Sequence, residues 1–327
     1  MKGKHLLIIL MIVFMILATS TSISAADANK ELRLGVGSMG GSFYYLSLVL
    51  QPELEKLLPD YAIGVVPGGD VANIKNLLAK EVDTAWLTGM SGEMALKGEP
   101  PYVKNTDIRF VATYYDTYWQ FAVKADSGIN SIADLKGKNI GVGTRGQQQS
   151  YSFEHLLKYY GLDYDKIEEA GGSVAFVGYA DGLKMFQDGT LDFYNYLNAY
   201  PWSSVMSIDT AVGVKLISLE DEAVEYMQEK YSAAKKAVIP KGTYSGMKED
   251  CTSIAFPYIF VAHKDLPEDV VYNICKATYD DESIWDDLVK NWPTGVTLDR
   301  ALTGNTGEAV PMHPGAVKYY KEKGMIK

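Results

Sequence analysis

Two glycine-rich turns constrain the fold of this chain more than any other feature. One turn spans residues 35–40 and the other spans residues 141–146; each follows a short apolar segment and precedes an aromatic, helix-like one. The first backbone N–H groups of a helix have no partner within that helix, so strand–turn–helix units of this kind bind polar or anionic groups. Two such units in one chain predict two α/β lobes that face each other across a cleft.

The N-terminus has the pattern of a secretory signal peptide. A basic region at residues 1–5 precedes an apolar run at residues 6–18 and small residues at 22–26. Because the apolar run is short for a bilayer span, we predict a cleaved signal peptide over residues 1–26 and a mature chain in the periplasm. An uncleaved N-terminal anchor is the alternative. No cysteine lies near the cleavage site, which argues against a lipid anchor.

Length and charge narrow the class of protein. A chain of 327 residues exceeds what one small core organises, which again favours two lobes. The net charge of −10 argues against long-range attraction to nucleic acid or to an anionic membrane. The cysteines, Cys251 and Cys275, are either two buried thiols or a disulfide formed in an oxidising compartment.

The order of predicted elements suggests how the lobes are connected. Strands alternate with helices along the chain, which favours a mostly parallel sheet in each lobe. The predicted boundaries assign residues 27–124 and 240–327 to lobe 1 and residues 125–239 to lobe 2. Two short strands within 110–123, and a return segment within 237–262, are the predicted crossings that form a hinge.

The first glycine turn also fits the dinucleotide-binding fingerprint, with Gly35, Gly37 and Gly40 at the required spacing. That fingerprint needs an acidic residue after the second strand to hold the ribose, and here the second strand ends at Val66-Pro67. A nicotinamide enzyme is therefore disfavoured, and we expect no cofactor.

Other catalytic patterns are weak. His155, His263 and His313 lack the spacing of metal ligands, and structural roles are expected for His155 and His263. The sequence also has no Gly-x-Ser-x-Gly nucleophile elbow and no Walker loop. We predict no catalytic residue, no metal site and no enzymatic activity.

Several motifs, in a fixed order, resemble the TAXI-type solute-binding subunits of TRAP transporters. Residues 34–44 are similar to that family's strand and Gly-Gly-Thr-Tyr-Tyr-like loop, and residues 68–74 resemble its Gly-Ser-Val-x-Asn helix start. Residues 131–143 resemble its Ser-Leu-x-Asp-Leu-Lys-Gly-Lys-x-Val-x-Val-Gly segment. Residues 311–320 resemble its closing Pro-Leu-His-Pro-Gly-Ala and Tyr-Tyr. The resemblance covers nearly the whole mature chain.

The resemblance implies a two-lobed periplasmic-binding-protein fold, also called a Venus flytrap, without catalysis. It implies that the protein captures a small carboxylate, such as glutamate or a dicarboxylate, and delivers it to TRAP membrane subunits. A receptor for an ATP-driven transporter and a ligand-sensing subunit are alternatives with the same fold, and an exported enzyme is the rival from another class. Residues 86–89, 145–150 and 192–196 depart from the family pattern, which leaves the identity of the solute open.

Arg145 is the foremost candidate for contact with a carboxylate. Its guanidinium offers a bidentate fork within a glycine turn at a helix start. A solvated loop arginine or an interlobe salt bridge is the alternative. Asp70 is a further candidate, although the helix N-cap is its favoured role. The remaining predicted ligand-binding residues are Ser38, Gly40, Ser42, Phe43, Tyr44, Asn73, Trp119, Thr144, Gln147, Gln148, Gln149, Ser150, Asn195 and Asn198. Of these, Asn73 is implied by the resemblance only, and packing of Tyr44 or Tyr45 into the core is the alternative to ligand contact.

Overall fold

A computed structural model describes residues 30–39, 41–145, 147–304 and 310–327. Within these residues the chain forms a mixed α/β structure in which the strands are hydrogen-bonded in the order β2-β1-β3-β10-β4-β7-β5-β6. Two further strands join this path from the side, because β8 pairs with β4 and β9 pairs with β10. The predicted signal peptide lies outside the described residues.

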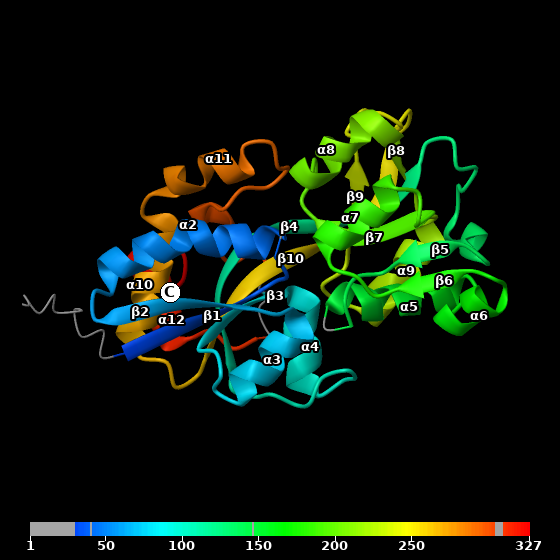
Figure 1. The fold of residues 1–327 in the computed structure, drawn as a ribbon. Coiled ribbons are helices and arrows are strands. Elements are labelled where there is room, and N and C mark those ends of the chain that lie inside the picture. The colour runs from blue at the N-terminus through cyan, green and yellow to red at the C-terminus, as the bar shows by residue number, and fades with distance from the viewer. Residues whose placement is uncertain (1–29, 40, 146, 305–309) are drawn as a thin grey trace, which may run out of the picture.

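One group of elements, called lobe 1 here, contains the N-terminal strands and both terminal parts of the described chain (Figure 1). In it, β1 pairs in parallel with β2 and β3, and Leu32 and Leu34 of β1 are fully buried. Its strands and helices are β1 (Lys30–Val36), α2 (Ser42–Leu57), β2 (Tyr61–Pro67), α3 (Asp70–Leu78), β3 (Thr84–Thr88), α4 (Gly89–Lys97), α10 (Glu268–Tyr279), α11 (Asp286–Val289) and α12 (Pro314–Glu322).

A second group, called lobe 2, lies at the other end of the molecule (Figure 1). Its central strand β7 pairs in parallel with β5, which pairs in parallel with β6. Its elements are β5 (Asn139–Gly141), α5 (Gln148–Tyr159), α6 (Tyr164–Glu169), β6 (Ser173–Ala175), α7 (Tyr179–Gln187), β7 (Phe193–Asn198), α8 (Ser203–Val212), β8 (Val214–Leu216), α9 (Asp221–Lys230) and β9 (Lys235–Ile239).

Two long antiparallel strands, β4 (Ile108–Lys124) and β10 (Cys251–His263), run through both lobes and connect them (Figure 1). The N-terminal part of β4 pairs with β10, whereas its part from Tyr118 onward pairs with β7 of lobe 2. β10 likewise pairs with β9 at its start and with β3 of lobe 1 near its end. The crossings therefore lie inside these two strands, and the predicted lobe boundaries stay a prediction.

Several predicted elements differ from the observed ones. The two short strands predicted within 110–123 are one strand of 17 residues, because β10 pairs with β4 through the segment that was expected to separate them. The sequence predicts a helix over residues 283–291, whereas the structure has a short 3-10 turn, Glu282–Trp285, followed by the four-residue α11. A capping box between Ser131 and Asp134 starts a 3-10 turn, Ile132–Leu135, at the predicted entry to lobe 2.

The cysteines are buried in different places and are not bonded to each other. Cys251 begins β10 and Cys275 lies in α10, and burial raises the pKa of the Cys251 thiol to about 12. The structure therefore has two buried free thiols and no disulfide between Cys251 and Cys275. In the described part of the chain, no helix has both the length and the apolar character that crossing a membrane requires.

Candidate ligand-binding site

A small cavity lies between the lobes, where glycine turns and helix starts from both sides meet. Its volume is about 30 Å³, room for roughly one or two water molecules. Anything larger fits only when the lobes or the lining side chains move apart. Lobe 1 and β10 supply Gly37, Gly41, Ser42, Phe43, Gly69, Asp70, Thr88 and Tyr258, and lobe 2 supplies Gln147, Gln148, Gln149, Tyr179 and Leu197.

Five helices begin at this cavity, namely α2, α3, α4, α5 and α7. The side chain of Thr88 caps α4. The N-cap residues of the other four are Gly41, Gly69, Gln147 and Gly178, and in the described part of the chain none of these forms a side-chain cap hydrogen bond. The first-turn N–H groups at the cavity are therefore suited to bind an acceptor atom of a ligand.

Asp70 brings a buried carboxylate to the cavity wall. Its side chain accepts hydrogen bonds from the backbone N–H of Thr88 at 2.9 Å, from Thr88 Oγ1 at 2.7 Å and from Ser91 Oγ at 2.6 Å. Burial raises the pKa of Asp70, and these hydrogen bonds act in the opposite direction. The expectation that Asp70 is the N-cap of its helix is wrong, because Gly69 holds that position and the carboxylate reaches the start of α4 instead.

Three consecutive glutamines lie at the start of α5. Two of them contact lobe 1, and the third contacts other residues of lobe 2. Gln147 Nε2 donates a hydrogen bond to Ser38 Oγ at 2.9 Å across the cleft. Gln148 Oε1 accepts hydrogen bonds from Ser91 Oγ at 3.3 Å and from the hydroxyl of Tyr102, both in lobe 1. These amides therefore join the lobes by direct side-chain contacts.

Gln149 remains within lobe 2. Its Nε2 donates to the backbone oxygen of Asn195 at 3.2 Å, and its Oε1 accepts from the hydroxyl of Tyr179 at 2.7 Å. The wall of lobe 2 is thus held by its own hydrogen bonds.

Ser42 forms another contact between the lobes. Its hydroxyl donates to Asn198 Oδ1 at the end of β7, over 2.8 Å, and also bonds to the hydroxyl of Tyr115 in β4. Because Ser42 is the first residue of α2, this contact ties the first glycine turn to lobe 2.

The structure brings many of the predicted ligand-binding residues together. Six line the cavity: Ser42, Phe43, Asp70, Gln147, Gln148 and Gln149. Ser38 and Asn198 adjoin it through hydrogen bonds to lining residues. Gly40 lies outside the described residues.

Other predicted residues do not line the cavity but form hydrogen bonds or packing contacts with neighbouring residues of the same lobe or of β4. Asn73 donates to the backbone oxygens of Val36 and Trp86, and Trp119 donates to Asn195 Oδ1. The backbone N–H of Thr144 donates to Gln147 Oε1, and Ser150 Oγ donates to backbone oxygens of the same turn. Tyr44 packs beside Tyr45 against the core of lobe 1.

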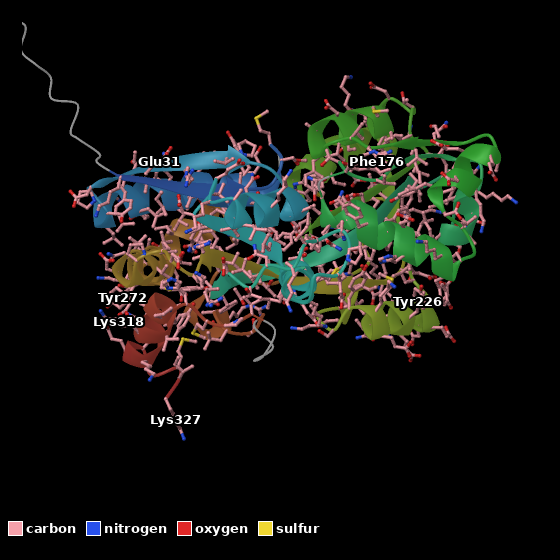
Figure 2. The ribbon with its side chains drawn as sticks, turned by 90° about the horizontal axis from the view of Figure 1, so that it is seen from below. Glu31, Phe176, Tyr226, Tyr272, Lys318 and Lys327 are labelled. Carbon is pink, nitrogen blue, oxygen red and sulfur yellow. The ribbon has the colours of Figure 1, made fainter. Side chains whose placement is uncertain are left out.

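Arg145 is exposed and does not line the cavity. Its guanidinium lies 3.6 Å from the centre of the Phe176 ring, which is a cation–π contact within lobe 2. Figure 2 labels Phe176 on lobe 2, together with Tyr226, whereas Tyr272 and Lys318 lie on lobe 1. The guanidinium of Arg145, which we expected to face a carboxylate, therefore packs on the ring of Phe176 instead.

Sequence reasoning missed several lining residues. Thr88 ends β3, and Tyr179 begins α7, so the rule that ligands bind at the carboxyl ends of strands could have found both. Tyr258 lies in the middle of β10, where nothing in its sequence context separates it from a core aromatic residue. The other residues missed are Gly37, Gly41, Gly69 and Leu197.

The cavity wall carries few charged groups. Asp70 is the one carboxylate among the described lining residues, and no histidine, lysine or arginine is among them. The described residues contain no group of three or more His, Cys, Asp or Glu side chains placed to hold a metal ion. His155 bonds to the hydroxyl of Tyr231, and burial lowers its pKa to about 4.

Comparison with known proteins identifies one family and a group of similar folds. The model of the NMT1-like family matches residues 34–324. PhnD1 from Prochlorococcus marinus (MIT 9301), solved in complex with methylphosphonate, has a TM-score of 0.53 at 15% identity, covering 90% of this chain and 99% of that one. The periplasmic binding protein BugD has the same TM-score, 0.53, and the same identity, 15%, covering 90% of this chain and 94% of its own. The predicted two-lobed periplasmic-binding-protein fold is confirmed.

Proposed function

The chain belongs to the NMT1-like family, and we propose that it is an extracytoplasmic receptor that captures a small polar solute between its two lobes. The observation that carries this proposal is the cavity itself, since both lobes contribute to its wall and four helices begin there without side-chain caps. The leader pattern at residues 1–26 supports export, and the absence of a catalytic constellation among the lining residues supports binding without turnover.

Capture requires that the lobes separate and close again. The cavity holds only about 30 Å³, so a solute enters when the interlobe contacts of Ser42, Gln147 and Gln148 are broken. Within the described residues, the chain passes between the lobes only in the two strands β4 and β10, which leaves a hinge for this motion. A solute that binds both walls then favours the closed arrangement over the open one.

A carboxylate remains a candidate for one end of the solute, although with different donors from those we expected. Arg145 stacks on Phe176, so the anion would bind to the first-turn N–H groups of α2 and α5 and to neutral side chains such as Ser42. Such donors bind a single carboxylate without a full countercharge.

The partner that we propose is an integral membrane permease. The order of motifs that resembles TAXI-type subunits supports TRAP membrane subunits, which use an ion gradient. An ATP-driven transporter or a signalling system remains the alternative, since receptors of this fold serve them too. Solute uptake by cells or vesicles that carry the genuine permease separates these: an ionophore abolishes TRAP-type uptake, and vanadate abolishes ATP-driven uptake.

The first test is a binding screen on mature protein that has been unfolded and refolded to remove any co-purified solute. Small carboxylates, amino acids, amines, phosphonates and sugars are tested by thermal shift, because a solute that binds only the native state raises the unfolding midpoint. We expect at least one hit, whose bound form is then recovered chemically unchanged. Conversion of the hit into a product would instead indicate an exported enzyme, and silence across the whole screen would contradict the proposal.

A further inference from the structure

We propose that the solute carries a protonated nitrogen that binds the carboxylate of Asp70. This proposal rests on the proposed function and names the class of solute that the same cavity takes. The group would be an ammonium or a guanidinium-type cation. The helix starts of α2 in lobe 1 and of α5 in lobe 2, at the same cavity, would hold the polar or anionic end of the same molecule.

The carboxylate of Asp70 is buried at the cavity. The side chain is only 6% exposed, and the three hydrogen bonds described above, from Thr88 and Ser91, all end on Oδ2. Asp70 forms part of the cavity wall, so a solute in the cavity can bring a further donor to the carboxylate.

The carboxylate of Asp70 also has no cationic partner among the described residues. Asp70 forms no salt bridge with any described residue, and the other lining residues are neutral. An ionised carboxylate that is buried without a cation is unfavourable, and a cation brought by the ligand offsets that cost. Arg145, the arginine of the second glycine turn, is engaged with Phe176 instead.

Aromatic rings around the carboxylate suit the same ligand. Phe43, Tyr179 and Tyr258 all line the cavity, and the rings of Phe43 and Tyr258 lie with their centroids 4.0 Å apart. Aromatic faces attract ammonium and guanidinium groups, and this attraction increases when the cation is desolvated.

An anionic solute without such a nitrogen fits this wall poorly. A dicarboxylate would bring a second negative charge close to Asp70, unless Asp70 took up a proton on binding.

The first experiment compares pairs of molecules that differ only in the amine. Refolded protein is titrated by calorimetry with L-glutamate and glutarate, L-alanine and propionate, γ-aminobutyrate and butyrate, and putrescine and 1,4-butanediol. We expect binding by the amine of at least one pair, with its amine-free partner weaker by about 30-fold or more, the loss typical of removing one partner of a buried charge pair.

The second experiment tests whether Asp70 is the residue responsible. Asp70→Asn keeps the shape and one carbonyl oxygen for the Thr88 and Ser91 donors but removes the charge. Asp209→Asn is the matched control, because Asp209 is also 6% exposed and accepts hydrogen bonds from the backbone N–H groups of Val214 and Ser245, yet does not line the cavity. We expect D70N to lose the preference for the amine and D209N to retain it.

The outcomes separate this proposal from the proposed function. Binding of amine-free acids or of neutral sugars, without preference for an amine, overturns the cation proposal and leaves the receptor function standing. Equal preference for the amine in D70N and in the unaltered protein also overturns it. Silence of the unaltered protein toward all solutes contradicts the receptor function itself. The paired titration of the unaltered protein decides the first question even if D70N does not fold.

Discussion

At the scale of single residues, Asp70 combines a cost in stability with the role in binding that we propose for it. Burial in the wall of the cavity raises its pKa, which means that the folded protein holds this proton more tightly than the unfolded chain does. Between the ordinary pKa and the raised one, the native state binds more protons, so the free energy of unfolding falls as pH rises through this window. Above the raised pKa the whole penalty is present.

We therefore expect Asp70→Asn to be more stable than the unaltered protein at pH 7 when no solute is present. The difference in free energy of unfolding should shrink as the pH is lowered toward 4, because the proton then neutralises Asp70 in the unaltered protein. Urea unfolding at a series of pH values measures this difference. A D70N variant that is less stable at pH 7 would show that the carboxylate is structurally required.

Arg145 leads to a contrasting prediction. Its guanidinium contacts the Phe176 ring and is exposed, so Arg145→Ala should lower the free energy of unfolding by no more than about 1 kcal/mol. The affinity for the solute should stay within about threefold, a change of well under 1 kcal/mol in binding free energy. Calorimetric titration checks this. A loss of tenfold or more would place the guanidinium at the solute and restore the original expectation from the sequence.

Residue types and their positions in glycine turns were enough to predict part of this wall. Ser42, Phe43 and Gln147 follow the turns directly, so their proximity to the cavity follows from strand–turn–helix geometry. The direction of a side chain is a different matter. Arg145 contacts Phe176, which lies far from it in the sequence. Tyr258 reaches the cavity from β10, the strand that returns from lobe 2 to lobe 1.

At the scale of elements, the close approach of α7 to β7 fixes the start of α7 at the cavity. Gly182 permits this approach, because a Cβ atom added there would lie 2.3 Å from the buried ring of Tyr194. Tyr179, one turn earlier on the same helix, is thereby held at the wall of the cavity.

We expect Gly182→Ala to lower the free energy of unfolding by about 1–3 kcal/mol, the usual effect of overpacking a close-packed interior. Gly178→Ala is the control on the same helix, since the nearest atom to an added Cβ there is Thr144 Cγ2 at 3.9 Å. That variant should change the free energy of unfolding by about 0.5 kcal/mol or less. Equal losses in both variants, measured by urea unfolding, would contradict the packing described for α7.

Periodicity and turn residues predicted most of these elements and the location of the crossings, but not the continuity of β4. The alternation of strands and helices predicted for lobe 1 follows from local sequence and is present in β1, α2, β2, α3 and β3. The continuity of β4 depends instead on pairing with β10, whose residues lie far along the chain. Long-range pairing of this kind leaves no signal within one segment.

At the scale of the whole molecule, the proposed function leads us to expect that side-chain hydrogen bonds between the lobes set the balance between closed and open forms. Ser42 bonds to Asn198 and to Tyr115, so Ser42→Ala should shift this balance toward the open form by roughly 2- to 10-fold, the effect of one hydrogen bond. Ser47→Ala is the matched control, since Ser47 is buried on the same helix but donates to the backbone oxygen of Tyr44 within lobe 1.

Small-angle scattering on both variants without solute measures this balance. We expect a larger radius of gyration for S42A than for S47A or for the unaltered protein. Identical scattering from all three would mean that the Ser42 contact does not control closure.

The two-lobed organisation was predicted from the paired glycine turns and from the resemblance, and the comparisons confirm that fold. The chemistry of the cavity was not predicted to the same extent, because it depends on which side chains converge from segments that are separate in the sequence. Asp70, Gln148 and Tyr258 meet only after both crossings have formed.

The most direct test of the receptor function is to combine scattering with titration of the solute that the binding screen identifies. The radius of gyration of the refolded protein is followed as this solute is added up to saturation. We expect it to fall as the lobes close, with a midpoint equal to the dissociation constant from calorimetry. Saturable binding with an unchanged radius of gyration would contradict capture between the two lobes.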